Sequence, residues 1–585
     1  MPSGPIKRAQ LIAPFGVGAM LIVRDGTSLI AAGLDHWYER EDGRDDVDKS
    51  EFRVDEWRLA QQLEVDHFRQ PPDYRKTNRR ESVPNAYLTV PFLRFPQWHF
   101  CPSCDRLKPL PLTVRGQVKC NECEMQKKTR FLVQVPIIAI CDHGHIQDFP
   151  WGEWVHRSVN PTCQKSMRLF GTGSATLAGL IVKCECGERR SLGGILGSSD
   201  PVLLCRGKRP WLGTEESEKC DRPLRGSQRS ASNVYYSQVR SAIYLRRGNN
   251  SELISLLEEP PLSSLINKLS SAGVAVTSEF LRELYPQVLQ RFSNKDIQAC
   301  LDIILLEGNA DQDIVNVEGD DLQSSFRRPE FNVLRTERNE NNLKIRVIDI
   351  NQYKSDIARY FSRIALVDKL RETRALAGFT RIFPETEQTL DSLKALLRCQ
   401  PQPRQDSWLP AYVVYGEGIF IELKEERLRG WLDKHGDEVH QRIATLVKNY
   451  EEVKEERKLR ERPLTPRFIL LHTFAHLLMN RLTFECGYSS AALRERLYVS
   501  DNPDAPMAGI LIYTAAGDSE GTMGGLVRIG KPVNFEPMVR AALEAASWCS
   551  ADPVCMEVGK RGGQGPDSCN LAACHNCALV PETGN

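Results

Sequence analysis

Two pairs of cysteines with the same internal spacing constrain the fold of this chain more than any other sequence feature. Cys101 and Cys104 form one C-x2-C pair, and Cys120 and Cys123 form a second after fifteen further residues. This spacing is typical of a zinc ribbon, in which four thiolates surround one Zn²⁺ tetrahedrally. A four-thiolate site leaves no coordination position open, so we expect this zinc to be structural and not catalytic.

Two further groups of cysteines predict further zinc sites. The first group consists of Cys184, Cys186, Cys205 and Cys220, and Cys163 is a spare that can replace one of them. The second group lies near the C-terminal end and consists of Cys549, Cys555, Cys574 and Cys577, with Cys569 as a fifth that spacing alone does not remove. We therefore expect about three structural zinc ions per chain.

A short segment between the first two cysteine groups also carries ligand-type side chains. These are Cys141, His143, His145 and Asp148. They contain no matched pair, and we expect them to form a hydrogen-bonded structural loop.

The redox state expected for the cysteines follows from the cell compartment. Residues 1–8 lack the apolar core of a signal peptide, and no apolar run reaches the ~18 residues that a membrane span requires. We expect a cytoplasmic protein without membrane contact, in which cysteines bind metal more often than they form disulfides.

The net charge is +1, so nucleic-acid binding requires a local basic surface.

The length of 585 residues predicts several domains. We expect an α+β, multi-domain fold with zinc-ribbon-like β modules, a helical insert and a C-terminal α/β domain with a zinc site. The predicted domains are an N-terminal α/β segment (1–95), a cysteine-rich zinc-binding β domain (96–250), a mainly helical insert (251–405) and a C-terminal domain (406–585). Within the insert, periodicity predicts helices over 262–269, over 277–292 with a break at Pro286, and over 357–376. Residues 410–423 are predicted to form a hairpin around residues 416–418.

The C-terminal domain contains the most organised stretch. Thr465 and Pro466 predict a helix start, and the apolar helix that follows carries His472 and His476 on one face. A second short helix is expected next, followed by an apolar strand over 508–514 and a polar glycine-rich loop over 515–525.

This stretch supports an alternative function. His472, His476 and Glu485, with Asp518 nearby, are residues that a metal-dependent phosphodiester hydrolase could use. Thr473, however, occupies the place of the glutamate base in the metalloprotease helix motif. A histidine pair on an apolar helix is more often packed in the core, so the principal expectation is that the chain has no catalytic residues.

A basic segment between residues 222 and 247 is a candidate DNA-binding surface. Its candidate contacts are Arg222, Arg225, Arg229 and Arg240, which would position phosphates, and Tyr235 and Tyr236, which would stack on bases. The equally weighted alternative is a strand pair with core tyrosines and solvated arginines.

The sequence has no complete P-loop. Residues 525–531 have the glycine–lysine spacing of the motif, but the next residue is Pro532 and not the required serine or threonine. We therefore expect no ATP hydrolysis by this chain.

Several short motifs, taken in order, resemble the DrmB family, the B component of the DISARM antiphage defence system. They lie at residues 13–19, 94–98, 144–151, 378–382, 416–420, 572–575 and 581–583. The C-terminal part resembles the helicase-associated domain of unknown function of that family.

The resemblance implies a role in antiviral defence, the restriction of phage. It also implies a partner, a DrmA-like superfamily-2 helicase that binds DNA and uses ATP, with which this chain would form a heterodimer. Phage DNA would then be bound and recognised through the complex.

Overall fold

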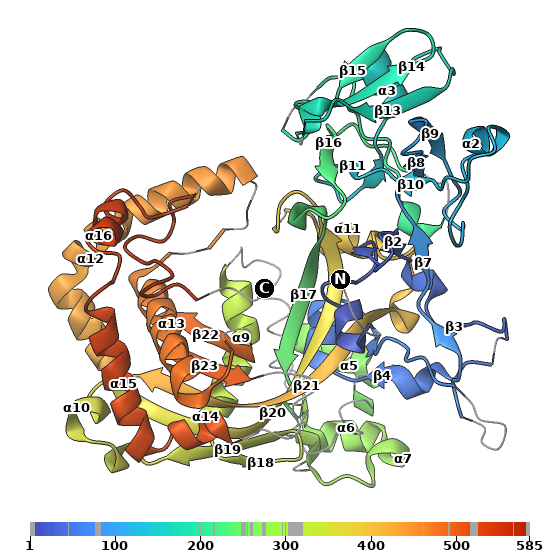
Figure 1. Ribbon diagram of the computed structural model, residues 1–585. Helices are drawn as coiled ribbons and strands as arrows, with labels where there is room; N and C mark the ends of the chain where they lie inside the picture. The colour runs from blue at the N-terminus through green and yellow to red at the C-terminus, as the bar shows by residue number, and fades with distance from the viewer. Residues whose placement is uncertain are drawn as a thin grey trace. The chain divides into compact units, whose positions relative to one another are not determined.

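The computed structural model describes residues 6–580 except 45, 77–82, 175, 198–199, 214–216, 247–252, 254–255, 258–260, 272–275, 295, 299, 302–319, 386, 458, 460, 463, 490–491, 515–523 and 566. The chain forms two compact units (Figure 1). The first unit comprises Met1–Ala242, Thr373–Val413 and Arg457–Leu459, and the second comprises Ile243–Glu372, Val414–Glu456 and Arg460–Asn585. Mixed helices and strands in several sheets confirm the α+β class. The four predicted domain boundaries stay a prediction.

Antiparallel sheets build most of the first unit. The largest has the order β10-β8-β9-β13-β14-β15 and consists of β8 (Trp98–Phe100), β9 (Arg106–Pro109), β10 (Val133–Gln134), β13 (Met167–Gly171), β14 (Leu180–Cys184) and β15 (Arg189–Ser191). A second sheet joins β11 (Ile137–Ile140) to β12 (Ile146–Asp148) and β16 (Arg225–Gln228), and a third joins β1 (Met20–Ile22), β2 (Ser28–Ala31) and β7 (Phe92–Arg94). Helix α3 (Trp151–His156) lies against β14 and β15 and buries Trp151 and Trp154. The first two sheets and α3 share one apolar core, which includes Cys141, Cys184 and Cys205, while Cys163 and Cys220 pack against it.

The first unit contains a buried arginine that connects distant segments. Arg381 is 1% exposed and donates hydrogen bonds to the backbone carbonyls of Gly18 (2.9 Å), Gly144 (2.8 Å) and Val234. Burial lowers the pKa of Arg381 to about 9. Buried carbonyls need hydrogen-bond donors, and the single guanidinium of Arg381 supplies them to carbonyls in three separate chain segments.

The second unit is built on the strand order β18-β19-β20-β21-β23-β22. These strands are β18 (Arg338–Asn339), β19 (Leu343–Ile348), β20 (Phe361–Thr380), β21 (Trp408–Leu423), β22 (Leu493–Ser500) and β23 (Met507–Thr514). Of β20 and β21, the second unit contains the parts up to Glu372 and from Val414 onwards. Figure 1 shows α13 (Pro466–Cys486) beside β22 and β23, with α15 (Pro532–Ala546) next to it. The core between these helices and strands includes Leu471, Leu478 and Ile510. The packing of this core fixes the rotation of α13 about its axis, and therefore the direction in which its two histidines point.

Several predicted helical features agree with the structure. Helix α13 begins at Pro466, the Thr465 side chain accepts a hydrogen bond from the Phe468 backbone, and Gly487 ends the helix with φ of 68°. Helices α5 (Leu262–Ser271), α6 (Ser278–Leu284) and α7 (Pro286–Leu289) also form, the last two separated at the predicted break. Within the described residues there is no helix that is long and apolar enough to cross a membrane.

The predicted helix over 357–376 is wrong, because β20 occupies Phe361–Thr380. The segment is rich in alanine, leucine and arginine, which favour helices in isolation. Antiparallel pairing with β19, from Ile348 opposite Ile364 to Leu343 opposite Leu370, overrides that preference. Glu372 is buried beside Arg496 of β22, so charged residues inside the strand hide its two-residue alternation.

The predicted hairpin over 410–423 is also wrong, because β21 runs without a turn from Trp408 to Leu423. Gly418 instead allows the backbone of β23 to lie close to that of β21. A Cβ at Gly418 would lie 2.7 Å from the carbonyl oxygen of Ile512 on the paired strand β23. The short helix expected before β23 is likewise a strand, β22.

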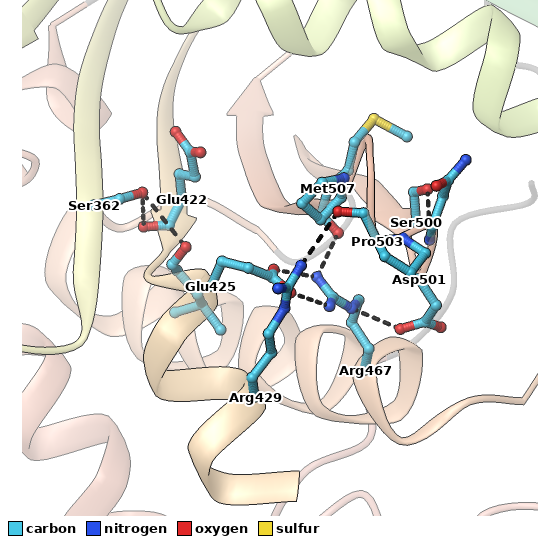
Figure 2. Close-up of polar contacts among 12 residues, drawn as sticks. Ser362, Glu422, Glu425, Arg429, Arg467, Ser500, Asp501, Pro503 and Met507 are labelled. Carbon is cyan, nitrogen blue, oxygen red and sulfur yellow. Dashed lines mark hydrogen bonds and ion pairs between the residues drawn. The ribbon is translucent and has the colours of Figure 1, made fainter. Parts of the chain in front are cut away.

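The start of the long helix α12 (Glu425–Arg457) is tied to α13 by one buried arginine. Figure 2 shows Arg467 between Glu425 and Asp501. Arg467 donates two hydrogen bonds of 2.7 Å to Glu425, one of 2.7 Å to Asp501 and one of 3.3 Å to the carbonyl of Met507. The side chain is 5% exposed. These bonds place the beginnings of two helices against the connection between β22 and β23.

Candidate metal centres

The four cysteines predicted to form a zinc ribbon come together in the structure. Cys101 and Cys104 lie in the turn after β8, Cys120 precedes α2 (Asn121–Met125), and Cys123 lies in that helix. The Sγ atoms of Cys101 and Cys123 are 3.6 Å apart, as are those of Cys104 and Cys120. Thiolates at the corners of a tetrahedron with 2.3 Å zinc–sulfur bonds lie about 3.8 Å apart. The geometry therefore fits one Zn²⁺ with four thiolate ligands.

The middle cysteines do not form one group, which corrects the sequence interpretation. Cys184 and Cys186 lie with Cys163 and His156, whereas Cys205 and Cys220 lie with Cys141 and His145. The spacing argument failed because both groups are completed by ligands from other elements. One histidine ends α3, and the other belongs to the β11–β12 turn that was expected to be only a hydrogen-bonded loop.

The cluster at the end of α3 contains three cysteines and one histidine. His156 Nε2 lies 3.3 Å from Cys186 Sγ, and Cys163 Sγ lies 3.7 Å from Cys184 Sγ. His156 Nδ1 donates to the carbonyl of Gly152 at 2.8 Å, which leaves the Nε2 lone pair available to a metal. The sequence offered no signal for His156, because no regular spacing links it to the other three residues.

The cluster after β11 has the same composition. His145 Nδ1 lies 3.4 Å from Cys141 Sγ and 3.6 Å from Cys205 Sγ, and its Nε2 lies 2.7 Å from a carboxylate oxygen of Glu218. A carboxylate behind a histidine is a common support for a zinc ligand. The hydrogen bond from Cys205, followed by the effects of His145, lowers the pKa of Cys141 to about 4 against the effect of burial. The spacing of Cys141 and His145, four apart, is the signal that could have indicated this site.

The C-terminal cluster brings together the four cysteines chosen from the sequence. The Sγ atom of Cys574 lies 3.5 Å from that of Cys549 and 3.8 Å from that of Cys577, and Cys555 of α16 (Val554–Gly559) completes the group. The fifth cysteine, Cys569, is not in the group, and its Sγ lies 3.1 Å from the Asp567 carbonyl.

The histidine pair of α13 meets a different carboxylate from the one predicted. His472 Nε2 lies 3.1 Å and His476 Nε2 lies 3.6 Å from Oε1 of Glu495 on β22. Burial opposes ionisation of Glu495, but the hydrogen bonds with both histidines outweigh it and lower the pKa of Glu495. Glu485 instead pairs with Arg481 at 2.6 Å, and Asp518 lies outside the described residues. Among the described residues, Glu485 therefore does not join the histidine pair, and Glu495 takes its place.

The arginines of the predicted DNA-binding segment differ in exposure. Arg225 is exposed, whereas Arg222 forms an ion pair with Asp142. Arg229 is half-buried and donates to the carbonyl of Gly26 at 3.1 Å, and Arg240 is half-buried on β17 (Tyr236–Ile243). Among these four, Arg225 is the side chain most available to a phosphate.

The two tyrosines of that segment are not exposed stacking platforms. The Tyr235 ring packs 5.2 Å from the ring of Phe379, and its hydroxyl is buried, which raises its pKa. Tyr236 is half-buried at the start of β17. The position of Tyr235 agrees with the alternative in which tyrosines of this segment belong to the core.

The C-terminal cysteine cluster lies in a stretch that matches the model of a known zinc-binding domain. Residues 474–578 match the MrfA Zn-binding domain, and residues 7–236 match a domain of unknown function, DUF8724. Over nearly its whole length the chain is similar to the DISARM protein DrmB of Bacillus paralicheniformis. The two are 29% identical over 542 residues, which cover 90% of each chain. The resemblance expected from the sequence motifs is thereby confirmed.

Proposed function

We propose that this chain is a non-catalytic zinc-binding subunit of a bacterial antiphage defence complex. It pairs with a DrmA-like superfamily-2 helicase, and the pair binds and recognises phage DNA. The similarity to DISARM protein DrmB across 90% of both chains carries this proposal. Because the matched length takes in both compact units, the proposed role is that of the whole chain and not of one zinc-binding module.

Four zinc ions, and not three, are the number we propose. Each cysteine-containing cluster supplies four ligands, and two of the clusters use a histidine as the fourth. Fully coordinated zinc of this kind stabilises folded segments and leaves no position for substrate. These sites therefore support a structural role for their zinc ions.

The surface near the C-terminal cluster is the proposed helicase contact. Trp548 is 69% exposed, Met556 is 58% exposed and Val554 is 56% exposed. Large exposed apolar side chains are frequent at protein interfaces, and tryptophan is enriched among the residues that dominate binding energy. The proposed heterodimer is permanent and buries more than the ~1,600 Å² of a standard interface. The helicase carries the ATP hydrolysis, since the sequence here has no complete P-loop.

The substitution Trp548→Asp tests this contact. It should weaken binding of the helicase by about 30-fold or more, the effect of removing about 2 kcal/mol at an interface hot spot. Met125→Asp is the matched control, because Met125 is 78% exposed in the zinc ribbon of the other unit. Affinity is measured by titrating labelled helicase. Equal affinity of the Trp548→Asp variant and the wild type would reject this surface as the contact.

A further inference from the structure

We propose that His472, His476 and Glu495 bind a divalent transition-metal ion, apart from the four cysteine-containing clusters. Two of the ligands come from consecutive turns of α13 and the third from the neighbouring strand β22. The proposed ion therefore links α13 to strand β22 of the neighbouring sheet. This inference stands on the geometry of the three side chains and does not depend on the helicase partner.

The distances between the three ligand atoms fit a single small cation. Oε1 of Glu495 lies 3.1 Å from His472 Nε2 and 3.6 Å from His476 Nε2, and all three atoms lie within 4.8 Å of one another. Zinc bonds of about 2.0–2.2 Å to nitrogen and oxygen place tetrahedral ligands about 3.4 Å apart. The site therefore needs little rearrangement to accept Zn²⁺.

The hydrogen bonds around the site favour a cation at its centre. His476 Nδ1 donates to the carbonyl of Ala578 at 3.2 Å, so Nε2 can also donate to Glu495 only when the ring is protonated, and in the neutral ring the Nε2 lone pair faces the carboxylate. Two electron-rich atoms in this position repel each other unless a positive charge lies between them. The same arrangement occurs in a cysteine-containing cluster, where His156 Nδ1 donates to a backbone carbonyl and Nε2 faces the ligand group.

The carboxylate adds a second indication. Oε2 of Glu495 is buried and accepts no hydrogen bond within the described part of the chain. A buried, incompletely bonded carboxylate is costly, and a bound cation would offset that cost. A proton shared between histidine and carboxylate is the competing explanation, and it predicts no dependence on metal.

The proposed site differs from the cysteine-containing clusters in being incomplete. Three protein ligands leave at least one coordination position for water or another ligand. The His472 side chain is 36% exposed, so this position can reach solvent. We therefore expect the ion to exchange with chelator faster than zinc held by four ligands that include buried thiolates.

The test measures zinc binding by the full chain. The protein is treated with a mild chelator, which removes the exchangeable ion while the cysteine sites stay loaded, and is then equilibrated with buffered free Zn²⁺. The wild type should bind one more ion per chain than Glu495→Gln, which keeps the side-chain volume, and than His472→Ala. Removal of a ligand should lower the affinity on the order of 100-fold or more. His435→Ala is the matched control, because His435 pairs with Glu438 at 3.3 Å on the exposed surface of α12 without a second histidine.

A second measurement needs no variant. Zinc that binds only the folded state raises the melting temperature of the chelator-treated wild type. Cobalt taken up at this site should also lack the thiolate-to-metal charge-transfer absorption that cobalt in the cysteine clusters shows. Equal zinc content of wild type and variants at every free Zn²⁺ concentration, or an unchanged melting temperature of the wild type on adding zinc, would overturn the proposal in favour of the shared proton.

Discussion

Replacing Arg467 should destabilise the second unit far more than replacing a neighbouring arginine with the same partner. Arg467 is 5% exposed and donates four hydrogen bonds, three of them to carboxylates. Arg429 bonds the same Glu425 at 2.9 Å and the carbonyl of Pro503 at 3.3 Å, but its side chain is 51% exposed. The substitutions Arg467→Met and Arg429→Met remove the charge and keep most of the chain length.

The expected magnitudes follow from burial. Removing one member of a buried ion pair costs roughly 3–5 kcal/mol, because the partner charges are left uncompensated. Glu425 is 25% exposed and Asp501 is 45% exposed, so water compensates part of that cost. We therefore expect about 3 kcal/mol for Arg467→Met. An exposed pair contributes at most about 1 kcal/mol, which is the upper limit for Arg429→Met.

Hydrogen exchange followed by mass spectrometry gives the readout. Peptides from α13, Pro466–Cys486, report local opening of the segment that Arg467 holds. A destabilisation of about 3 kcal/mol should speed their exchange by about two orders of magnitude in Arg467→Met, and one of at most about 1 kcal/mol by less than about tenfold in Arg429→Met. Similar acceleration in the two variants would refute the reasoning that burial and multiple bonding set the contribution.

Two further predictions concern zinc and DNA. Cys574→Ser should lower the zinc content of the purified chain by one ion, because Cys574 lies in the C-terminal cluster. Cys569→Ser should leave the zinc content unchanged, because Cys569 lies outside that cluster. Elemental analysis measures the zinc content of both variants. Arg225→Glu should weaken DNA binding by the complex with the helicase and reduce the slope of log affinity against log salt by about 1, because one arginine no longer neutralises a phosphate. Arg115→Glu, an exposed arginine in the first unit, is the charge-matched control, and equal binding by the two variants at every salt concentration would argue against a role for Arg225 in binding DNA.

Features that depend on neighbouring residues were predictable from the sequence. The two C-x2-C pairs predicted the group of Cys101, Cys104, Cys120 and Cys123 that the structure brings together, and the Thr465–Pro466 start and the Gly487 end of α13 were visible as local capping signals. The histidines of α13 share a face because of helix geometry alone.

Features that depend on distant residues were not predictable. His156 and Glu495 join their clusters from separate elements, so no spacing rule connects them with the other ligands. In β20, burial of Glu372 beside Arg496 removed the alternation that identifies a strand. Gly418 suggested a turn because glycine is frequent in turns. In the structure, glycine is needed there because the backbone of β23 leaves no room for a side chain.

The most direct test of the central claim combines purification and catalysis in one sample. The full chain and its DrmA-like helicase are mixed at physiological salt, the mass of the complex is determined, and DNA-stimulated ATP hydrolysis is measured for each protein alone and for the mixture. We predict a one-to-one complex, no ATP hydrolysis by this chain alone, and higher DNA affinity or DNA-stimulated ATP hydrolysis for the complex than for the helicase alone. Separate elution of the two proteins, or ATP hydrolysis by this chain without the helicase, would contradict the account.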